Sequence, residues 1–381
     1  MRTLLQVATG LTSLVLLAGC SGPESVPSTD TRTAGESATA ASTPAPSPSS
    51  SVSPSASADQ PDAPTGEPKV NDLATGLRVP WGILPLADGT LLVSERETGA
   101  ILRIDGSDRQ TVRTLDVETG SEGGLLGLAI TGDTNTVFAY YSTGRDNRIV
   151  AMNWDGSTLG KPKVILDGLP HGGRHNGGGL LVGPDNLLYV GTGDTSQTDL
   201  AQDRDSLAGK ILRLTLAGEP APGNPFDSRV YSYGHRNVQG LAFDDDDRLW
   251  ASEFGENDYD ELNLISAGAN YGWPKVEGSG DVEGLTNPKV VWQTSEASPS
   301  GLAYWRGSLW MAALRGTRLW QIPVDGTEAG KPVDHLVGDY GRLRAVSVAE
   351  DGDALLVSTS NTDGRGNPAD ADDRILRLVW S

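Results

Sequence analysis

Cysteine is almost absent from this sequence of 381 residues, which contains only Cys20. A single cysteine excludes a disulfide within the chain, and with only four histidines no Cys/His cluster supports a structural zinc site. Basic residues are also fewer than acidic ones: the sequence has 30 Lys and Arg and 50 Asp and Glu, which gives a net charge of −20. Binding to nucleic acid needs a basic face, so this balance argues against a nucleic-acid partner.

The one marked apolar run, near the start, is too short to cross a bilayer. It follows Arg2 and ends in Leu17-Ala18-Gly19-Cys20. A positive start, a short apolar core and small residues before a cleavage point are typical of a secretion signal. A cysteine directly after the small residues resembles a bacterial lipobox. We therefore expect a signal peptide over residues 1–19, a lipid anchor on Cys20 and an extracytoplasmic protein held at the cell membrane. An ordinary signal with an incidental cysteine is the alternative.

Large apolar and aromatic side chains are also scarce from about Ser21 to Pro68, where Ser, Pro, Thr and Ala dominate. Such a segment cannot bury enough apolar surface to offset the entropy lost on ordering. It predicts a disordered tether over residues 20–68, followed by one folded domain over residues 69–381. A glycosylated stalk or a binding segment is the alternative for this stretch.

What the sequence has in abundance is turn formers, with 48 Gly and 23 Pro, and a repeated strand-turn-strand unit. The second strands begin at Leu91, Val137, Leu187, Leu249, Leu309 and Leu355, at intervals of roughly 46, 50, 62, 60 and 46 residues. The first strands are Trp81-Gly82-Ile83, Gly127-Leu128-Ala129-Ile130, Gly179-Leu180-Leu181-Val182, Gly240-Leu241-Ala242-Phe243, Gly301-Leu302-Ala303-Tyr304 and Ala345-Val346-Ser347-Val348. Six such units predict an all-β fold, a six-bladed β-propeller. A pair of β-sandwiches is the alternative, but a sandwich has no reason to repeat at this period.

Polar residues gather before the first strands and after the second strands. Antiparallel strands joined by a tight turn place these positions at the same edge, and therefore around one opening of the channel. Four arginines are expected there: Arg236, Arg315, Arg342 and Arg344. Several guanidinium groups converging in an acidic protein indicate a multiply anionic ligand bound through carboxylates or phosphates.

His175 is the candidate base at this opening, because neutral imidazole is the usual acceptor of a hydroxyl proton near neutral pH. Glycines on both sides of it would let a ligand approach the backbone. Asp194, at the end of the next strand, could hold its other ring nitrogen. A solvated turn histidine is the alternative.

An acidic run, Glu253 to Glu261, provides the hard oxygen ligands that calcium requires, although it lacks the ligand spacing of an EF-hand. A solvated acidic loop is the alternative.

Four stretches together resemble the glucose/sorbosone dehydrogenase family, the quinone-dependent soluble aldose sugar dehydrogenases. The resemblance runs from about Asp72 to the C-terminus. The best-matched stretches are Arg174-His175-Asn176 through Val182-Gly183-Pro184-Asp185, Ala208-Gly209-Lys210-Ile211-Leu212-Arg213, Tyr233-Gly234-His235-Arg236-Asn237-Val238-Gln239-Gly240-Leu241-Ala242-Phe243, and Gly268-Ala269-Asn270-Tyr271-Gly272-Trp273-Pro274. The family's fold, a six-bladed propeller, agrees with the count of repeats.

The resemblance implies an oxidoreductase that binds pyrroloquinoline quinone (PQQ) and calcium, oxidises an aldose to a lactone and passes electrons to an acceptor in the cell envelope. It implies that His175 is the base and that Asp194 orients it. The implied cofactor contacts are Glu122, Arg236, Asn237, Arg315, Arg342 and Arg344. The backbone carbonyls of Gly255 and Glu256 would bind the cofactor's calcium, and Asp260, Glu261 and Tyr271 would bind a second, structural calcium.

The sequence departs from the family pattern near the site. Arg315 stands where lysine is usual, Glu122 where glutamine is usual, and Glu256 where proline is frequent. Arg174 precedes His175 where some members carry aspartate. These departures leave the sugar open. Two other functions also remain open: a calcium-dependent propeller lactonase, and a non-catalytic propeller that binds carbohydrate or protein.

Overall fold

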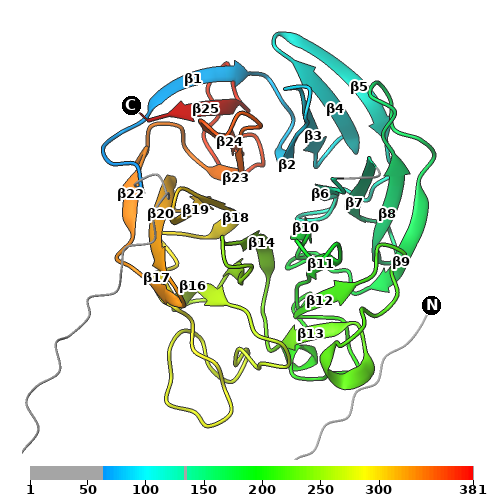
Figure 1. The fold of residues 1–381 in the computed structure, drawn as a ribbon, viewed down its shortest axis with the longest axis vertical. Helices are drawn as coiled ribbons and strands as arrows, with labels where there is room; N and C mark the ends of the chain where they lie inside the picture. The colour runs from blue at the N-terminus through cyan, green and yellow to red at the C-terminus, as the bar shows by residue number, and fades with distance from the viewer. Residues whose placement is uncertain (1–62, 133–134, 381) are drawn as a thin grey trace, which may run out of the picture. The chain divides into compact units, whose positions relative to one another are not determined.

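The structure is a computed structural model that describes residues 63–132 and 135–380. In this part of the chain there is no α-helix, and six antiparallel sheets are arranged around a central channel (Figure 1). The predicted six-bladed propeller is therefore confirmed. The innermost strands, one from each blade, are β2 (Pro80–Pro85), β6 (Leu125–Ile130), β10 (Leu180–Val182), β14 (Val238–Phe243), β18 (Pro299–Trp305) and β23 (Leu343–Val348). Five of them contain the first strand predicted from the repeat, and β10 matches its prediction except for Gly179, which lies just before it.

Each blade continues outward through a second, a third and a fourth strand. The second strands are β3 (Leu91–Glu95), β7 (Thr136–Ser142), β11 (Leu188–Gly191), β15 (Leu249–Glu253), β19 (Ser308–Ala313) and β24 (Leu355–Thr359). The third strands are β4 (Ala100–Asp105), β8 (Asn147–Asn153), β12 (Lys210–Leu214), β16 (Tyr259–Leu264), β20 (Arg318–Asp325) and β25 (Ile375–Val379). The fourth strands are β5 (Asp108–Thr114), β9 (Lys163–Leu169), β13 (Val230–Tyr233), β17 (Val290–Gln293), β22 (Val333–His335) and β1 (Lys69–Ala74), and a short β21 (Glu328–Ala329) pairs with the end of β20.

The last blade joins the two ends of the described chain. Strand β1 pairs antiparallel with β25, from Lys69 opposite Val379 to Ala74 opposite Ile375 (Figure 1). This closure was not predicted. Strand β1 reads Lys-Val-Asn-Asp-Leu-Ala and has no strong apolar pattern, because it is the outermost and most exposed strand of its blade.

Residues 63–68, which we expected to belong to the disordered tether, contact the propeller. Gln321 donates to the Pro64 carbonyl (3.1 Å), and the Trp380 indole donates to the Gly66 carbonyl (2.9 Å). The rest of the predicted tether, the signal peptide and Cys20 lie outside the described residues. In the part of the chain that is described, no helix is long and apolar enough to cross a membrane.

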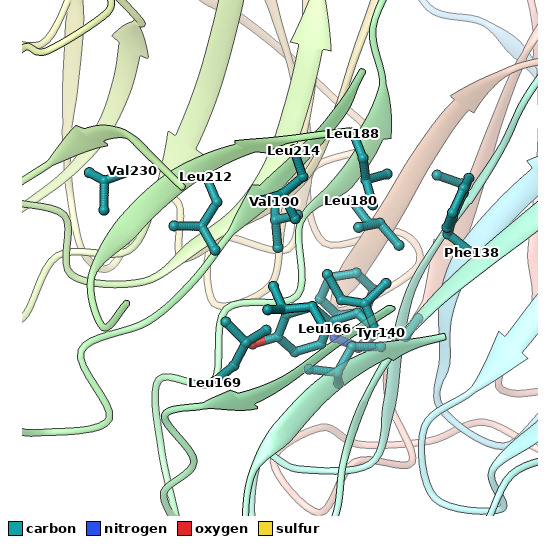
Figure 2. Close-up of a cluster of buried hydrophobic side chains, with 14 residues drawn as sticks. Phe138, Tyr140, Leu166, Leu169, Leu180, Leu188, Val190, Leu212, Leu214 and Val230 are labelled. Atoms are coloured by element: carbon teal, nitrogen blue, oxygen red, sulfur yellow. The ribbon is translucent and has the colours of Figure 1, made fainter. Parts of the chain in front are cut away.

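The hydrophobic core is divided into six clusters, each lying between two neighbouring blades. Figure 2 shows the cluster between the second and third blades, where Phe138 and Leu166 face Leu188 and Leu212. Because adjacent side chains of a strand point to opposite faces, both faces of a blade can contribute to such clusters. Tyr140 belongs to this cluster and is fully buried. Tyr140 therefore links the core between the second and third blades to the loop that precedes β10, because its hydroxyl donates to the Asn176 carbonyl in that loop.

Five of the six innermost strands change register close to their first residue. In β14, for example, the shift falls between Val238 and Gly240. Such bulges bend a strand and redirect its side chains, and they are common beside active sites. Here they lie at the end of the channel where the innermost strands begin. We call this end the mouth.

Candidate active site at the channel mouth

His175 lies in a glycine-rich loop between β9 and β10, with a backbone φ of 56°. The loop is held in place on three sides. Gly177 N donates to the Asn237 side-chain oxygen (2.9 Å), and the Tyr140 hydroxyl donates to the Asn176 carbonyl (2.8 Å). On the third side, a Cβ atom at Gly193 would lie 1.8 Å from the His175 carbonyl oxygen, so only glycine allows this approach. The left-handed backbone of His175 is thus fixed by its surroundings.

The His175 ring is oriented by Asp194, as predicted from the position of these residues. His175 Nδ1 lies 2.7 Å from Asp194 Oδ1, and Asp194 is fully buried. The carboxylate also accepts hydrogen bonds from Ser196 N (2.7 Å) and from the Trp273 indole (2.8 Å). Burial acts to raise the pKa of Asp194, but the bonds from His175, Ser196 and Trp273 hold that pKa below its usual value. Asp194 is therefore an ionised acceptor, which leaves Nε2 of His175 as the ring nitrogen free to act.

His175 lines a cavity of about 380 Å³ at the mouth, the mouth cavity. Nine of the predicted site residues line it: Glu122, His175, Arg236, Asn237, Gly255, Glu256, Arg315, Arg342 and Arg344. Asp194 lies directly behind His175. The structure therefore brings together residues from five blades that are up to 222 positions apart, counting from Glu122 to Arg344. The argument from strand ends located them correctly, while their chemical roles stay predictions.

Arginines dominate the electrostatics of the mouth cavity. Seven line it: Arg96, Arg174, Arg236, Arg315, Arg342, Arg344 and Arg365. Burial lowers the pKa of Arg344 to about 9, and the charges of Arg96 and Arg342 act in the same direction. Burial also lowers the pKa of Arg236. The Nε atoms of Arg96 and Arg236 are buried and have no hydrogen-bond partner within the described chain. Buried, mutually repelling cations with open donors fit a polyanionic ligand.

Asp363 offsets part of this charge. Its carboxylate accepts bonds from Arg342 Nε (3.2 Å) and Nη2 (3.0 Å) and lies 3.9 Å from Arg344 Nη2. Burial acts to raise the pKa of Asp363, yet the charge of Arg342, the bond from Arg365 N and the charge of Arg344 bring it below the usual value. Asp363 thus fixes the direction of these two guanidinium groups before any ligand binds.

Glu122 contacts the loop of His175 directly. Its Oε2 accepts from His175 N (2.9 Å), and its Oε1 accepts from Arg365 Nη2 (3.0 Å). Burial opposes ionisation of Glu122, but the bond from His175 N and the charge of Arg365 hold its pKa below the usual value. Because Glu122 stands where glutamine is usual, a carboxylate occupies this position. It connects the second blade to His175 of the third blade and to Arg365 of the sixth.

The expected metal ligands fall into two groups. Gly255 and Glu256 lie on the wall of the mouth cavity, where their carbonyls could serve a cation beside the ligand. The loop that carries them is fixed by Glu277, whose Oε1 accepts from four successive backbone N–H groups, those of residues 256–259, at 2.5–3.1 Å. Asp260, Glu261 and Tyr271 do not line this cavity.

Asp260, Glu261 and Tyr271 have different hydrogen-bond partners. Asp260 accepts from Gly255 N (2.9 Å) and Ser298 N (2.5 Å), whereas Glu261 accepts from Gly278 N (2.7 Å) and Asn263 (3.1 Å). As neighbours in β16, the two carboxylates point to opposite faces of the sheet. The Tyr271 hydroxyl donates to the Leu264 carbonyl (2.6 Å). In residues 63–132 and 135–380, no group of three His, Cys, Asp or Glu could hold a metal ion. The second, structural calcium that the resemblance implies at Asp260, Glu261 and Tyr271 stays a prediction.

Sequence reasoning missed three residues of the site. Arg96 directly follows the second strand β3, so the rule applied to the other blades would have found it. Arg365 lies six residues beyond the end of β24 at Thr359, in the long connection between β24 and β25. Trp273 contacts Asp194 from a loop between β16 and β17, and it stacks on Arg236 at 5.3 Å. No local signal marks a tryptophan as the partner of a carboxylate 79 residues away.

Comparisons with known proteins agree with this geometry. Residues 77–377 match the family described as Glucose / Sorbosone dehydrogenase. The chain is 34% identical over 255 residues to quinoprotein glucose dehydrogenase B of Acinetobacter calcoaceticus, covering 56% of this chain and 53% of that protein. It is 31% identical to the aldose sugar dehydrogenase YliI of Escherichia coli, covering 65% of this chain and 77% of that protein.

A solved structure is similar over the whole propeller. The PQQ-bound aldose sugar dehydrogenase of Streptomyces coelicolor has 51% sequence identity and a TM-score of 0.80, covering 84% of this chain and all of that one. Fold, mouth residues and family match thus lead to one conclusion: the chain belongs to the glucose/sorbosone dehydrogenase family of oxidoreductases.

Proposed function

We propose that this protein is a PQQ-dependent aldose sugar dehydrogenase that oxidises the C1 hydroxyl of an aldose to the lactone, with His175 as general base. The observation that carries the proposal is the position of His175. Its Nδ1 is held by a buried Asp194 at 2.7 Å, and its ring lines a cavity walled by seven arginines. The quinoprotein and PQQ-bound relatives support the choice of cofactor.

The base works through the geometry of the pair. Asp194 accepts the Nδ1–H of His175, so the neutral ring presents a lone pair on Nε2. That nitrogen takes the proton of the C1 hydroxyl while the C1–H hydrogen leaves with its electron pair, and a C1=O bond forms. The fixed carboxylate then stabilises the imidazolium ion. Because Asp194 is already oriented by Ser196 and Trp273, no rearrangement is needed during the step.

When bound, the quinone supplies a two-electron oxidant. Its carboxylates would be held by Arg236, Arg315, Arg342 and Arg344, with Asn237 beside them. The open Nε of Arg236 and the pKa of Arg344, which burial and then the charges of Arg96 and Arg342 lower, support this assignment. A polyanion would accept from the first and offset the positive charge around the second. A calcium ion would be bound through the carbonyls of Gly255 and Glu256, because carbonyl oxygens are ligands that calcium accepts.

The remaining expectations concern location and partners. We propose that Cys20 anchors the protein to the membrane, outside the cytoplasm, and that an acceptor in the envelope takes the electrons. Cys20→Ser should release the protein from membranes into the soluble fraction. Release of the unchanged protein by washing would argue against the anchor.

The function is tested by loading the purified chain with PQQ and calcium and following the reduction of a dye with a panel of aldoses. Sugar-dependent turnover is expected only with the cofactor. His175→Ala should abolish turnover and leave the PQQ dissociation constant within about three-fold, whereas His171→Ala, in the same loop, is the matched control. If His175→Ala loses PQQ binding, the residue holds the cofactor and is not the base. If bound PQQ gives no turnover with any aldose, the function is wrong.

A further inference from the structure

The mouth cavity carries more positive charge than the proposed cofactor uses. Seven arginines line it, while only Glu122 and Glu256 line it as carboxylates, in a protein with a net charge of −20. Four of the arginines are assigned above to the quinone. Arg96 is buried, as are Arg236 and Arg344. Arg174 and Arg365 remain, and both lie at the rim.

Arg174 is placed beside the base by the backbone. Glu122 N donates to the Gly173 carbonyl (3.3 Å), and Glu122 Oε2 accepts from His175 N (2.9 Å), so Glu122 holds the chain on both sides of Arg174. The Arg174 side chain is exposed and lines the mouth cavity. Within the described chain its guanidinium makes no hydrogen bond and no ion pair. It is a free cation next to His175.

Arg365 reaches the same place from the sixth blade. Its Nη2 donates to Glu122 Oε1 (3.0 Å), the carboxylate that also binds His175 N. Its side chain is 49% exposed, and the bond to Glu122 uses only one of the N–H groups of its guanidinium. Two cations with unused donors therefore lie beside Glu122 and the loop of His175, on the wall of the mouth cavity.

We propose, on the basis of the proposed function, that the aldose oxidised here carries an anionic group, which Arg174 and Arg365 bind beside His175. A carboxylate, as in a hexuronate, matches the planar donors of guanidinium, and a phosphate offers the same chemistry. The reaction is unchanged: the C1 hydroxyl proton goes to His175 Nε2, the C1–H hydrogen leaves with its electron pair, and the C1=O bond of the lactone forms. The bound quinone would be the two-electron acceptor. The anionic group takes no part in these bond changes. Its role is to hold the sugar ring in place while they occur at C1.

Binding without turnover is the first test. Methyl β-D-glucuronide and methyl β-D-glucoside cannot be oxidised at C1, so calorimetry on the PQQ- and calcium-loaded protein measures their binding alone. The glucuronide should bind at least about ten-fold more tightly, which is the effect of one charge-assisted contact. Added salt should reduce this difference. Equal affinities for the two glycosides would overturn the proposal.

Arginine variants locate the binding. Arg174→Gln and Arg365→Gln should each lower the glucuronide-to-glucoside affinity ratio about ten-fold. Arg145→Gln, an exposed arginine in the turn between β7 and β8, is the matched control and should keep the wild-type ratio. Unchanged ratios in both rim variants would show that the charge is bound elsewhere and would overturn the proposal.

Turnover measurements distinguish a carboxylate from a phosphate as the anionic group. They also separate the proposed anionic substrate from the proposed dehydrogenase function. The ratio of kcat/KM for D-glucuronate to D-glucose should exceed about ten, and D-glucose 6-phosphate compared with D-glucose tests the phosphate separately. Equal use of charged and neutral sugars would reject the anionic substrate and leave the dehydrogenase standing. Loss of all turnover despite preferential glucuronide binding would instead reject the proposed function.

Discussion

Asp194→Asn is the most informative single substitution in the site. The wild-type carboxylate accepts three hydrogen bonds, two at Oδ1 from His175 Nδ1 and Ser196 N, and one at Oδ2 from Trp273. Asparagine has one acceptor oxygen and one NH₂ donor. At least one of the three donors must therefore face another donor, inside a fully buried environment.

Two arrangements of the asparagine are possible, and both have a measurable cost. If the amide oxygen faces Trp273, the NH₂ group faces His175 Nδ1 and stabilises the tautomer that carries its hydrogen on Nε2. That tautomer cannot accept the sugar proton. If the oxygen faces His175, the Trp273 indole loses its acceptor, and the imidazolium ion loses its counter-charge. We expect kcat to fall by roughly 10²- to 10⁴-fold, the usual contribution of a general base, and stability to fall by about 1–3 kcal/mol.

The assay compares kcat, PQQ affinity and denaturant unfolding for Asp194→Asn and for Asp199→Asn, an exposed carboxylate nearby. The pKa of Asp194 is lowered in the folded protein, so its stabilisation is present above the ordinary carboxyl pKa and is lost as pH falls through the lowered value. The variant should lack this loss on the acid side. A variant with kcat within about two-fold of the wild type would refute the role of Asp194 in orienting the base.

Three further predictions concern the support of the site. Tyr140→Phe leaves the Asn176 carbonyl without its donor and should cost about 1 kcal/mol in denaturant unfolding; no change would mean that this bond does not hold the loop. Asp363→Asn leaves Arg342 and Arg344 without their buried carboxylate and should cost about 3–5 kcal/mol near neutral pH. Because the pKa of Asp363 is lowered, this difference should shrink as pH falls through that value, and a constant difference in thermal unfolding across the acid range would contradict it. Glu122→Gln keeps an acceptor for His175 N but releases Arg365, so it should raise the kcat/KM ratio of glucuronate to glucose; a lower ratio would mean that Glu122 assists the anion.

The fold was predictable because each blade repeats a local pattern. A glycine or alanine followed by small and branched apolar residues, then a polar turn and a second apolar strand, identifies β14 and β15 without any long-range information. Strand β1 could not be found in this way. Its partner β25 lies about 300 residues away, as Lys69 opposite Val379 shows, and its own residues are largely exposed.

The candidate site was predictable to the extent that strand ends define it. The rule placed Arg236 and Arg344 in one cavity before any contact was known, and it would have placed Arg96 there too. The second calcium does not depend on this rule, because its ligands Asp260, Glu261 and Tyr271 come from the family resemblance, and it stays a prediction. Contacts such as Trp273 with Asp194 depend on how two loops meet, which no strand pattern records.

The pairing of β1 with β25 also sets an order of events. The sixth blade needs the first strand and the last strand of the propeller at once, so the ring closes only after both strands have been made. Arg342 and Arg344 lie at the start of β23, in that same blade. The arginine-lined cavity is therefore completed only after β25 has met β1, and any ligand that needs all of these arginines can be captured only by the closed ring.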